Sequence, residues 1–373
     1  MPDLTLIILS AGNSTRFGCQ VKKQWIIIDD TPLWKFVANR FTNLADFEDV
    51  IITASAKEIN YMKKNSDHTF VEGGATRQES LNNALKEVKT PYVIVTDVAR
   101  ACIPDDMIKN IIDSRDKADI VVPYLSVSDT VVYKDETIDR DEVKLIQTPQ
   151  LSKTSVLKKA LDQKEIFTDD SSAVKSIGGT LFYTKGSIKA KKITRYDDLK
   201  ALECLSEPNN AVFIGTGFDV HQFCKNKKMY LGGVEIESDF GFLAHSDGDV
   251  ALHALIDALL GAVGAGDIGE LFPDTDNRYK DLDSKVMLKD VVAFIKEVGF
   301  EINNVDITIL AETPRLSSYK DKMRKTIASI LECEPVKVNI KATTTEKLGF
   351  VGRKEGVAVE AAASLKFYNW KRI

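Results

Sequence analysis

Five short apolar runs, separated by helix-like patterns, constrain the fold of this chain more than any other feature. The runs are LTLIIL (4–9), VIIT (50–53), YVIVTD (92–97), DIVVPYL (119–125) and TLFY (180–183). Uninterrupted apolar strands are typical of sheets that are covered on both faces, so they predict a Rossmann-like, mostly parallel sheet in an α/β unit. Ligands of such sheets bind beyond the carboxyl ends of the strands. The polar or glycine-bearing segments SAGNSTRFG, DVARA and SVSDTVV follow those ends.

The pattern breaks at SEPNNA (206–211), where a proline and two asparagines interrupt the apolar runs. This composition is typical of a linker. Beyond it we expect a strand beginning AVFIG, a glycine turn, a long alanine- and leucine-rich helix, and then further helices and strands. That order predicts an α+β unit with helices packed on a sheet. The 373 residues are therefore expected to form two domains, residues 1–208 and 209–373.

Composition excludes several classes of protein. The formal net charge of −5 argues against a nucleic-acid binder, and no apolar run approaches the length of a membrane span. The N-terminal MPDLTLIILSAG lacks a basic segment and reads as a strand, not a signal peptide. Five scattered cysteines without a CxxC pair predict neither a disulfide framework nor a cysteine zinc site, which favours a cytoplasmic protein.

A glycine-bearing loop follows the first strand in LIILSAGNSTRFGCQVKKQW, with Arg16, Lys22 and Lys23 close by. Backbone N–H groups in such loops bind anions, and the cations add charge. The loop is neither a P-loop nor a GxGxxG fingerprint. On these residues alone, a strand–turn–helix junction with incidental basic residues remains open as the alternative.

The stretch AHSDGDVALHALIDA (244–258) contains two of the four histidines of the chain. A helix is expected to begin near Ser246 or Asp247, either of which can cap it. Asp249, His253 and Asp257 then lie four apart on one helical face. The two carboxylates could orient His253, and capping or solvent exposure is the alternative.

Earlier in the second half, GTGFDVHQF places Asp219 two residues before His221. The third glycine of a dinucleotide fingerprint is missing there. Residues two apart in extended backbone face the same way, so both side chains can meet one partner. With His253 they would make a three-ligand zinc site with an open position. A solvated His–Asp pair is the alternative.

The first half resembles the 2-C-methyl-D-erythritol 4-phosphate cytidylyltransferases of the non-mevalonate isoprenoid pathway. The resemblance rests on SAGNSTRFG…KKQW, VEGGATRQESLNNAL, VTDVARACI, SDTV, TIDR…QTPQ, TDDSSAV and KITRYDDL, spread in order over about 200 residues. It implies transfer of CMP from CTP to methylerythritol phosphate, with release of pyrophosphate and with Mg²⁺. Two departures from the usual pattern are Ser14 in place of a loop glycine, and Val98 and Ala101 in place of the usual DAARP residues.

This resemblance implies a set of site residues in the first half. Arg16 and Lys23 would stabilise charge on the α-phosphate, and Arg140 and Lys192 would hold the methylerythritol phosphate. Asp97 would help to bind Mg²⁺ and hydroxyl groups. The remaining contacts are implied for Ala11, Gly12, Gly74 and Ser80 on the nucleotide side, and for Arg100, Thr130, Thr148 and Thr168 on the substrate side.

The second half closely resembles 2-C-methyl-D-erythritol 2,4-cyclodiphosphate synthase. The matching text is GFDVH, LAHSDGDVALHALIDALLGA, GDIGELFPDTD, ITILAETPRL and KATTTEKLGFVGRKEG. It implies that the 2-phosphate of a cytidine diphosphate derivative attacks its own β-phosphate, which forms a cyclic diphosphate and releases CMP. Zn²⁺ and Mg²⁺ are the implied cofactors.

By this resemblance Asp219, His221 and His253 fall on the zinc ligands, while His245 and Thr344 fall on residues that hold the diphosphate. Ser246 would contact a phosphate. The other implied binding residues are Asp267 and Gly269 for ribose, Phe272, Asp274 and Asp276 for methylerythritol, Ala311, Pro314, Arg315 and Leu316 for cytosine, Thr343, Thr345 and Glu346 for phosphates and Mg²⁺, and Phe350 and Arg353 for the substrate side.

The resemblance also implies a homo-oligomer, with a trimer through the second domain and pairing of first domains. One alternative is a sugar-phosphate nucleotidyltransferase fused to a zinc hydrolase, although HExxH and PCxxC motifs are absent. A second is a nucleotide-binding regulatory protein without turnover. That class would have lost the charge-stabilising or metal-binding residues, and they are present.

Overall fold

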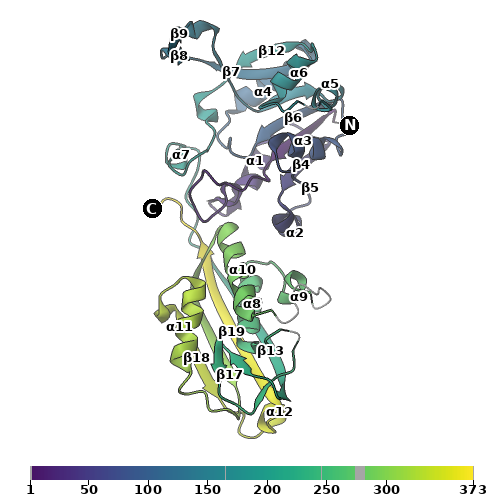
Figure 1. Ribbon diagram of the computed structural model, residues 1–373. Helices are drawn as coiled ribbons and strands as arrows, with labels where there is room; N and C mark the ends of the chain where they lie inside the picture. The colour runs from purple at the N-terminus through teal and green to yellow at the C-terminus, as the bar shows by residue number, and fades with distance from the viewer. Residues whose placement is uncertain (1, 164, 245, 274–281, 373) are drawn as a thin grey trace. The chain divides into compact units, whose positions relative to one another are not determined.

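The computed structural model describes residues 2–163, 165–244, 246–273 and 282–372. The chain forms two compact units, Met1–Glu207 and Pro208–Ile373 (Figure 1). Within the described residues, none of the helices combines the length and the apolar character needed to cross a membrane.

The first unit is built on one mixed, mostly parallel sheet, which confirms the predicted fold class. Strands β5, β4, β1 and β6 run parallel to one another, and β12 runs parallel to β7. Strand β11 lies antiparallel between β6 and β7, an insertion that the sequence did not predict. In sheet order the strands are β10 (Lys144–Ile146), β7 (Ile120–Ser126), β11 (Gln150–Lys153), β6 (Tyr92–Asp97), β1 (Leu4–Leu9), β4 (Asp49–Ala54) and β5 (Thr69–Glu72), with β12 (Leu181–Lys185) beside β7.

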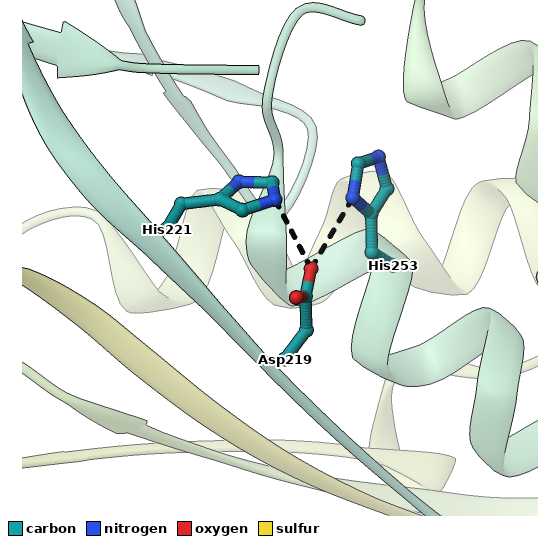
Figure 2. Close-up of side chains that lie close together, drawn as sticks. All are labelled: Asp219, His221 and His253. Carbon is teal, nitrogen blue, oxygen red and sulfur yellow. Dashed lines mark ion pairs between the residues drawn. The ribbon is translucent and has the colours of Figure 1, made fainter. Parts of the chain in front are cut away.

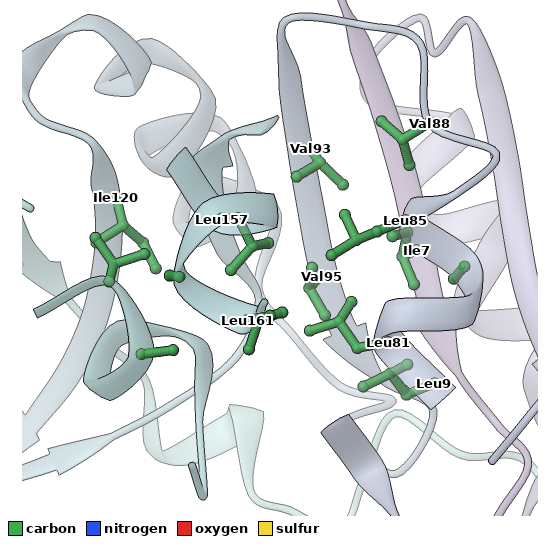
Figure 3. Packing of buried hydrophobic residues seen from close by; sticks show 14 of the residues in the cluster. Ile7, Leu9, Leu81, Leu85, Val88, Val93, Val95, Ile120, Leu157 and Leu161 are labelled. Carbon is green, nitrogen blue, oxygen red and sulfur yellow. The ribbon is translucent and has the colours of Figure 1, made fainter. Parts of the chain in front are cut away.

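Helices cover this sheet and bury β1 completely along its length, which explains its unbroken apolar run. Figure 3 shows side chains of Leu81, Leu85, Leu157 and Leu161 packed with those of the central strands. Outside the sheet, β8 (Val131–Tyr133) and β9 (Glu136–Ile138) form an exposed hairpin. The helices are α1 (Leu33–Thr42), α2 (Ala56–Lys64), α3 (Arg77–Leu85), α4 (Asp105–Asp113), α5 (Thr154–Leu161), α6 (Asp170–Ser176) and α7 (Asp197–Lys200), with short strands β2 (Ile27–Ile28) and β3 (Thr31–Pro32) before α1.

A disulfide in the first unit corrects one sequence-based expectation. Cys102 and Cys204 are bonded, with their Cα atoms 5.8 Å apart and 102 positions between them in sequence. Cys102 follows β6, and Cys204 lies in the last segment of the same unit. Counting cysteines and searching for CxxC pairs detects local frameworks, so a single bridge between distant segments leaves no such signal.

The second unit is an α+β sandwich of helices on one sheet, as predicted. The sheet order is β16 (Phe240–Phe242), β13 (Val212–Lys225), β19 (Gly356–Phe367), β17 (Phe300–Leu310) and β18 (Val338–Thr343), and a separate hairpin joins β14 (Met229–Leu231) to β15 (Val234–Ile236). The helices are α8 (Val250–Ala262), α9 (Ile268–Leu271), α10 (Ser284–Glu297), α11 (Lys320–Leu331) and α12 (Gly349–Gly352). Helix α8 packs on β13 and β19.

The predicted glycine turn near the start of the second unit is wrong, because Gly215 and Gly217 lie inside the long strand β13. They allow α8 to approach the strand closely. A Cβ atom at Gly215 would lie 2.1 Å from the carbonyl oxygen of Ala258, and one at Gly217 would lie 2.0 Å from that of Ala254. The two glycines therefore serve packing, and the strand continues unbroken through Asp219 and His221.

The two faces of β13 differ sharply. Gly215, Gly217, Asp219 and His221 alternate along the side that faces α8. The intervening side chains point the other way and are exposed, including Ile214 (72%) and Phe218 (63%). An amphipathic alternation of this kind usually buries its apolar side, whereas here both sides of the strand carry apolar or functional groups.

Candidate functional site

In the first unit, a cavity of about 270 Å³ lies at the carboxyl ends of β1 and β6. Its lining brings together residues that are far apart in sequence, as expected for an α/β sheet. Of the residues predicted from the sequence, Gly12, Arg16, Lys23, Asp97 and Lys192 line it. The glycine-bearing loop after β1 supplies the first three, Asp97 ends β6, and Lys192 comes from the segment after β12.

Asp97 is the electrostatic centre of this cavity. Lys192 Nζ lies 2.7 Å from Asp97 Oδ2, and Arg77 Nε lies 3.4 Å from Asp97 Oδ1. Burial alone would raise the pKa of Asp97, but the charges of Arg77 and Lys192 outweigh it and lower the pKa. The carboxylate is therefore ionised and held by two cations.

Sequence reasoning missed Arg77. It begins α3 directly after the capping Thr76, and its guanidinium joins Asp97 to Asp170, with Nη1 2.7 Å from Asp170 Oδ1. Asp170 is buried, so Arg77 ties the first turn of α6 to the end of β6. A basic residue at a helix start, where cations are unfavourable, was the available signal.

The expected nucleotide-side residues cluster beside the cavity. Ser80 Oγ accepts a hydrogen bond of 3.0 Å from the N–H of Gly74. A Cβ atom at Gly73 would lie 2.3 Å from the Cβ atom of Ala11. The loop after β1 and the loop after β5 can therefore come this close only because residue 73 is a glycine. Ala11, Gly74 and Ser80 thus adjoin one another, although the cavity lining does not include them.

The other predicted residues of this unit lie outside the cavity lining in the described part of the chain. Thr148 Oγ1 accepts from the N–H of Asp97 at 3.5 Å, and Arg100 Nη1 donates to Ala190 O at 2.5 Å. Thr130 and Thr168 are exposed. Arg140 is also exposed, and its Nη1 donates to Ser128 O at 2.6 Å.

In the second unit, Asp219, His221 and His253 form a compact cluster whose ligand atoms all lie within 4.8 Å of one another. Figure 2 shows the two imidazoles flanking the carboxylate. His221 Nε2 and His253 Nδ1 each lie 3.3 Å from Asp219 Oδ2. The structure therefore brings together the two strand residues and the helix residue that the resemblance placed in one ligand set.

The pKa values in this cluster favour metal binding. Burial lowers the pKa of His221 and outweighs the raising effect of Asp219, so the neutral ring is favoured. Burial alone would raise the pKa of Asp219, but the hydrogen bond from His253 and the charge of His221 lower it. Neutral imidazoles and an ionised carboxylate are the forms that bind a cation.

The outer ring nitrogens are fixed by partners that the sequence analysis missed. His221 Nδ1 lies 2.8 Å from Gly248 O, and His253 Nε2 lies 2.9 Å from Ser284 Oγ. Ser284 Oγ donates to Asp247 Oδ1 at 2.5 Å, which leaves its oxygen free to accept from the imidazole. Both outer nitrogens have acceptors for a ring proton, so the inner nitrogens would be free to offer lone pairs to a cation bound in place of their present contacts with Asp219.

The structure also shows whether Asp249 and Asp257 orient His253 or serve another role. Asp249, not Ser246 or Asp247, caps α8, and it accepts hydrogen bonds from the backbone N–H groups of Gly232, Gly233 and Leu252. Burial raises its pKa to about 6.

Asp257 Oδ1 accepts from the N–H of Ile268 at 2.8 Å. Neither carboxylate bonds His253 among the described contacts, so the alternative of capping holds for both. Ser246 Oγ, by contrast, lies 3.3 Å from His253 Nε2.

Two loops that the sequence predicts to bind substrate follow β17 and β18, whose ends are paired at Leu310 and Thr343. Ala311 N donates to Thr343 O at 2.9 Å, so the two loops start next to each other. The first loop contains the predicted residues Ala311, Pro314, Arg315 and Leu316. Thr344 Oγ1 donates to Glu346 at 3.0 Å, and Thr345 N donates to Glu312 at 3.2 Å.

These loops adjoin further predicted residues. Phe350 lies in α12 and is partly exposed, and Arg353 pairs with Glu355 at 2.9 Å. Among the described residues, no hydrogen bond or ion pair links the Thr343–Phe350 segment to the histidine cluster.

The ribose-binding candidates lie at α9. Asp267 caps this helix by accepting from Glu270 N at 3.0 Å, Gly269 lies within it, and Phe272 follows it. His245, Asp274 and Asp276 lie outside the described residues.

Comparison with known proteins identifies both units. The model of the family 2-C-methyl-D-erythritol 4-phosphate cytidylyltransferase matches residues 4–207, and that of the YgbB family matches residues 212–366. A bifunctional enzyme IspD/IspF of Aliarcobacter butzleri is 56% identical over 373 residues, and one of Nitratiruptor sp. is 54% identical, each with 100% of both chains covered. A solved structure of the bifunctional IspDF from Campylobacter jejuni is 45% identical with a TM-score of 0.90, again over 100% of both chains.

The fold, the sites and these matches define an enzyme with two catalytic domains in one chain, a nucleotidyltransferase and a lyase. The chain belongs to the bifunctional IspD/IspF family of the non-mevalonate isoprenoid pathway. Its activities are those of 2-C-methyl-D-erythritol 4-phosphate cytidylyltransferase and 2-C-methyl-D-erythritol 2,4-cyclodiphosphate synthase, which confirms the predicted function. The alternative of a sugar-phosphate nucleotidyltransferase fused to a zinc hydrolase is not favoured.

Proposed function

We propose that residues 1–208 transfer CMP from CTP to methylerythritol phosphate and that residues 209–373 cyclise the cytidine diphosphate derivative. The observation that carries this division is that each compact unit contains its own site of different chemistry. The first has a cavity bordered by Arg16, Lys23 and Lys192, and the second has the carboxylate–histidine cluster.

In the first domain, the substrate phosphate attacks the α-phosphate of CTP and pyrophosphate leaves, so no covalent enzyme intermediate is needed. Arg16 and Lys23 stabilise the charge that develops at the α-phosphate, and Gly74 gives the backbone close access to the base. Lys192 and Arg140 hold the methylerythritol phosphate, and Asp97 helps to bind Mg²⁺. Support comes from the shared cavity of Arg16, Lys23, Asp97 and Lys192.

The remaining contacts of the first domain follow the family pattern. Ala11, Gly74 and Ser80 adjoin the cavity and are proposed to contact the nucleotide. Arg100, Thr130, Thr148 and Thr168 are proposed for the substrate side. Arg140 lies apart from the cavity lining beside the exposed hairpin β8–β9, which fits the proposed pairing of two first domains.

In the second domain, Asp219, His221 and His253 are proposed to bind Zn²⁺. The donor set fits the ion, because two imidazoles and a carboxylate converge while the outer ring nitrogens are hydrogen-bonded. Bound zinc would supply Lewis-acid polarisation of the β-phosphate. The protein's task is to fold the substrate so that its 2-phosphate oxygen reaches the β-phosphorus, the bond to the α-phosphate breaks, and CMP leaves.

Several loop residues are proposed to hold the folded substrate. His245 and Thr344 would hold the diphosphate, with Ser246 on a phosphate and with Thr343, Thr345 and Glu346 on phosphates and Mg²⁺. Ala311 to Leu316 would bind cytosine, and Asp267 and Gly269 would bind ribose. Phe272, Asp274, Asp276, Phe350 and Arg353 would enclose the methylerythritol part.

We also propose a trimer through the second domain. The outward side of β13 exposes Val212 (57%), Ile214 (72%) and Phe218 (63%), an apolar strip that a second copy of the chain would bury. We place the enzyme in the cytoplasm, because CTP is available there.

One experiment on the intact chain tests the division of labour. Pyrophosphate release from CTP and methylerythritol phosphate is measured beside CMP release from the cytidine diphosphate substrate. Lys23→Ala is expected to reduce only the first activity, by roughly 10³-fold. His253→Ala is expected to remove zinc and only the second activity. Loss of both activities in either variant, or of neither in both, would refute the proposed assignment.

A further inference from the structure

The loop after β1 contains a non-glycine residue in a left-handed conformation. Ser14 has a φ of +53°, a region that costs an L-residue about 1–2 kcal/mol. Its backbone oxygen accepts from Phe17 N at 2.8 Å, which closes the turn. Glycine would adopt this conformation without strain, so the serine side chain should supply something that glycine cannot.

The Ser14 hydroxyl makes two hydrogen bonds across the cavity wall. Its oxygen accepts from the backbone N–H of Lys23 at 3.0 Å, and its proton is donated to Gln24 Oε1 at 3.3 Å. The side chain therefore clamps the start of the loop to the Lys23–Trp25 turn. Because Lys23 and Ser14 both line the cavity, the clamp is part of the cavity wall.

A buried carboxylate fixes the direction of this hydrogen-bond chain. Glu58, on the first turn of α2, is 1% exposed and accepts from Trp25 Nε1 at 2.7 Å and from Gln24 Nε2 at 3.2 Å. Gln24 Nε2 also donates to Gly12 O at 3.2 Å. Because both partners of Nε2 only accept, the amide oxygen of Gln24 must face Ser14, and the Ser14 oxygen is left to accept from Lys23.

We propose that Ser14 is a positioning residue for cytidylyl transfer, through which Glu58 and Gln24 hold Lys23 in place at the nucleotide cavity. This inference rests on the proposed role of Lys23 at the α-phosphate. The hydroxyl compensates for the strained backbone, and it ties the glycine-bearing loop to the lysine that follows it nine positions later.

The surroundings of Lys23 explain why such a restraint is useful. Burial lowers the pKa of Lys23, and the nearby charges of Lys192 and Arg16 lower it further. Without substrate phosphates, a lysine in this position is drawn toward solvent by both effects. A fixed backbone N–H limits that movement and keeps the side chain near the cavity before CTP binds.

The test compares Ser14→Gly with the native full-length enzyme. Glycine adopts the positive φ without strain, so a loss of function in this variant does not come from a strained backbone. Amide hydrogen exchange is measured at Lys23, with the Val95 amide in β6 as the check that the domain remains folded. Ser66→Gly is the matched control, because Ser66 Oγ also accepts from a backbone N–H, that of His68 at 3.4 Å, in a loop outside the cavity lining.

We expect exchange at Lys23 to be about 10-fold faster in Ser14→Gly, with Val95 unchanged and with Ser66→Gly like the native enzyme. The kcat for pyrophosphate release should fall about 10-fold while KM for CTP changes less than twofold, because the positioned charge acts in the transition state. A Glu58→Gln variant should also speed exchange at Lys23, since it weakens the orientation of Gln24.

Native-like exchange at Lys23 in Ser14→Gly, or an equal kcat loss in Ser66→Gly, would overturn the proposal. The role of Lys23 itself is tested separately by Lys23→Ala. If that variant keeps its activity while Ser14→Gly speeds exchange, the assignment of Lys23 is wrong and the clamp exists without the catalytic consequence.

Discussion

The two sites of this chain are assembled in contrasting ways. Asp219 and His221 occupy alternate positions of β13, and His253 lies on the helix packed against that strand, so regular elements set their spacing. The first cavity draws Arg16 and Lys23 from a loop, Asp97 from a strand end and Lys192 from a segment 95 positions away. The residues of the proposed metal site are thus positioned by regular elements, whereas the cavity of the first domain is joined by long-range side-chain contacts such as that of Lys192 with Asp97.

Treatment that removes zinc should produce the largest difference between the two activities. A zinc-selective chelator is expected to lower CMP release by at least 10³-fold, with recovery when zinc is returned at roughly one ion per chain. Pyrophosphate release should be unchanged when Mg²⁺ is kept constant. If both activities fell together, the contrast between a metal-organised site and a loop-organised site would be wrong.

Ser284→Ala tests how firmly His253 is held in the proposed metal site. The hydroxyl links His253 Nε2 to Asp247, so its loss should weaken zinc binding by about 10- to 100-fold, measured by chelator competition. Ser238→Ala, at a partly exposed position of the same domain, is the control and should bind zinc normally. Zinc affinity equal to that of the native protein would mean that the helix alone fixes the ring.

Asp249→Ala tests whether the elements that carry the proposed metal site are stabilised within the second domain. Its carboxylate accepts from three backbone N–H groups and joins the β14–β15 hairpin to the start of α8. We expect the free energy of unfolding of the second domain to fall by about 3 kcal/mol, measured by hydrogen exchange of α8 amides. An equal increase in hydrogen exchange of α3 amides in the first domain would contradict the idea that the two units are stabilised independently.

Alkaline pH should slow the reaction at the loop-organised site, and this is the smallest of the four expected effects. Because burial and then Lys192 and Arg16 lower the pKa of Lys23, its charge is lost at a lower pH than that of an ordinary lysine. The kcat for pyrophosphate release should therefore decline several-fold as pH rises through that lowered pKa. A rate that stays constant up to the ordinary lysine range would show that the charge of Lys23 is not required.

The same contrast explains how far sequence could predict this enzyme. The period of two in a strand and the four-residue spacing in a helix predicted that Asp219, His221 and His253 could meet, and the apolar runs predicted the parallel sheet. Ser284 and Arg77 were missed because their partners lie 31 and 93 positions away. The Cys102–Cys204 bridge was missed for the same reason.

Local geometry set a second limit on prediction. Gly215 and Gly217 suggested a turn, because sequence cannot tell a glycine needed for backbone freedom from one needed for close packing. The sequence placed the start of α8 near Ser246 or Asp247 instead of at Asp249, since each of these three residues can cap a helix.

Strand β13 has a consequence for how this family can vary. On its inward side, glycines pack against α8, and Asp219 and His221 belong to the histidine cluster. Its outward side chains form the exposed apolar strip. Inserting or deleting one residue between Gly217 and Asp219 would exchange the two sides beyond that point, sending the carboxylate outward and Val220 inward. The proposed metal site and the exposed apolar strip therefore depend on the same residue alternation along β13, so a change in length by one residue would disturb both.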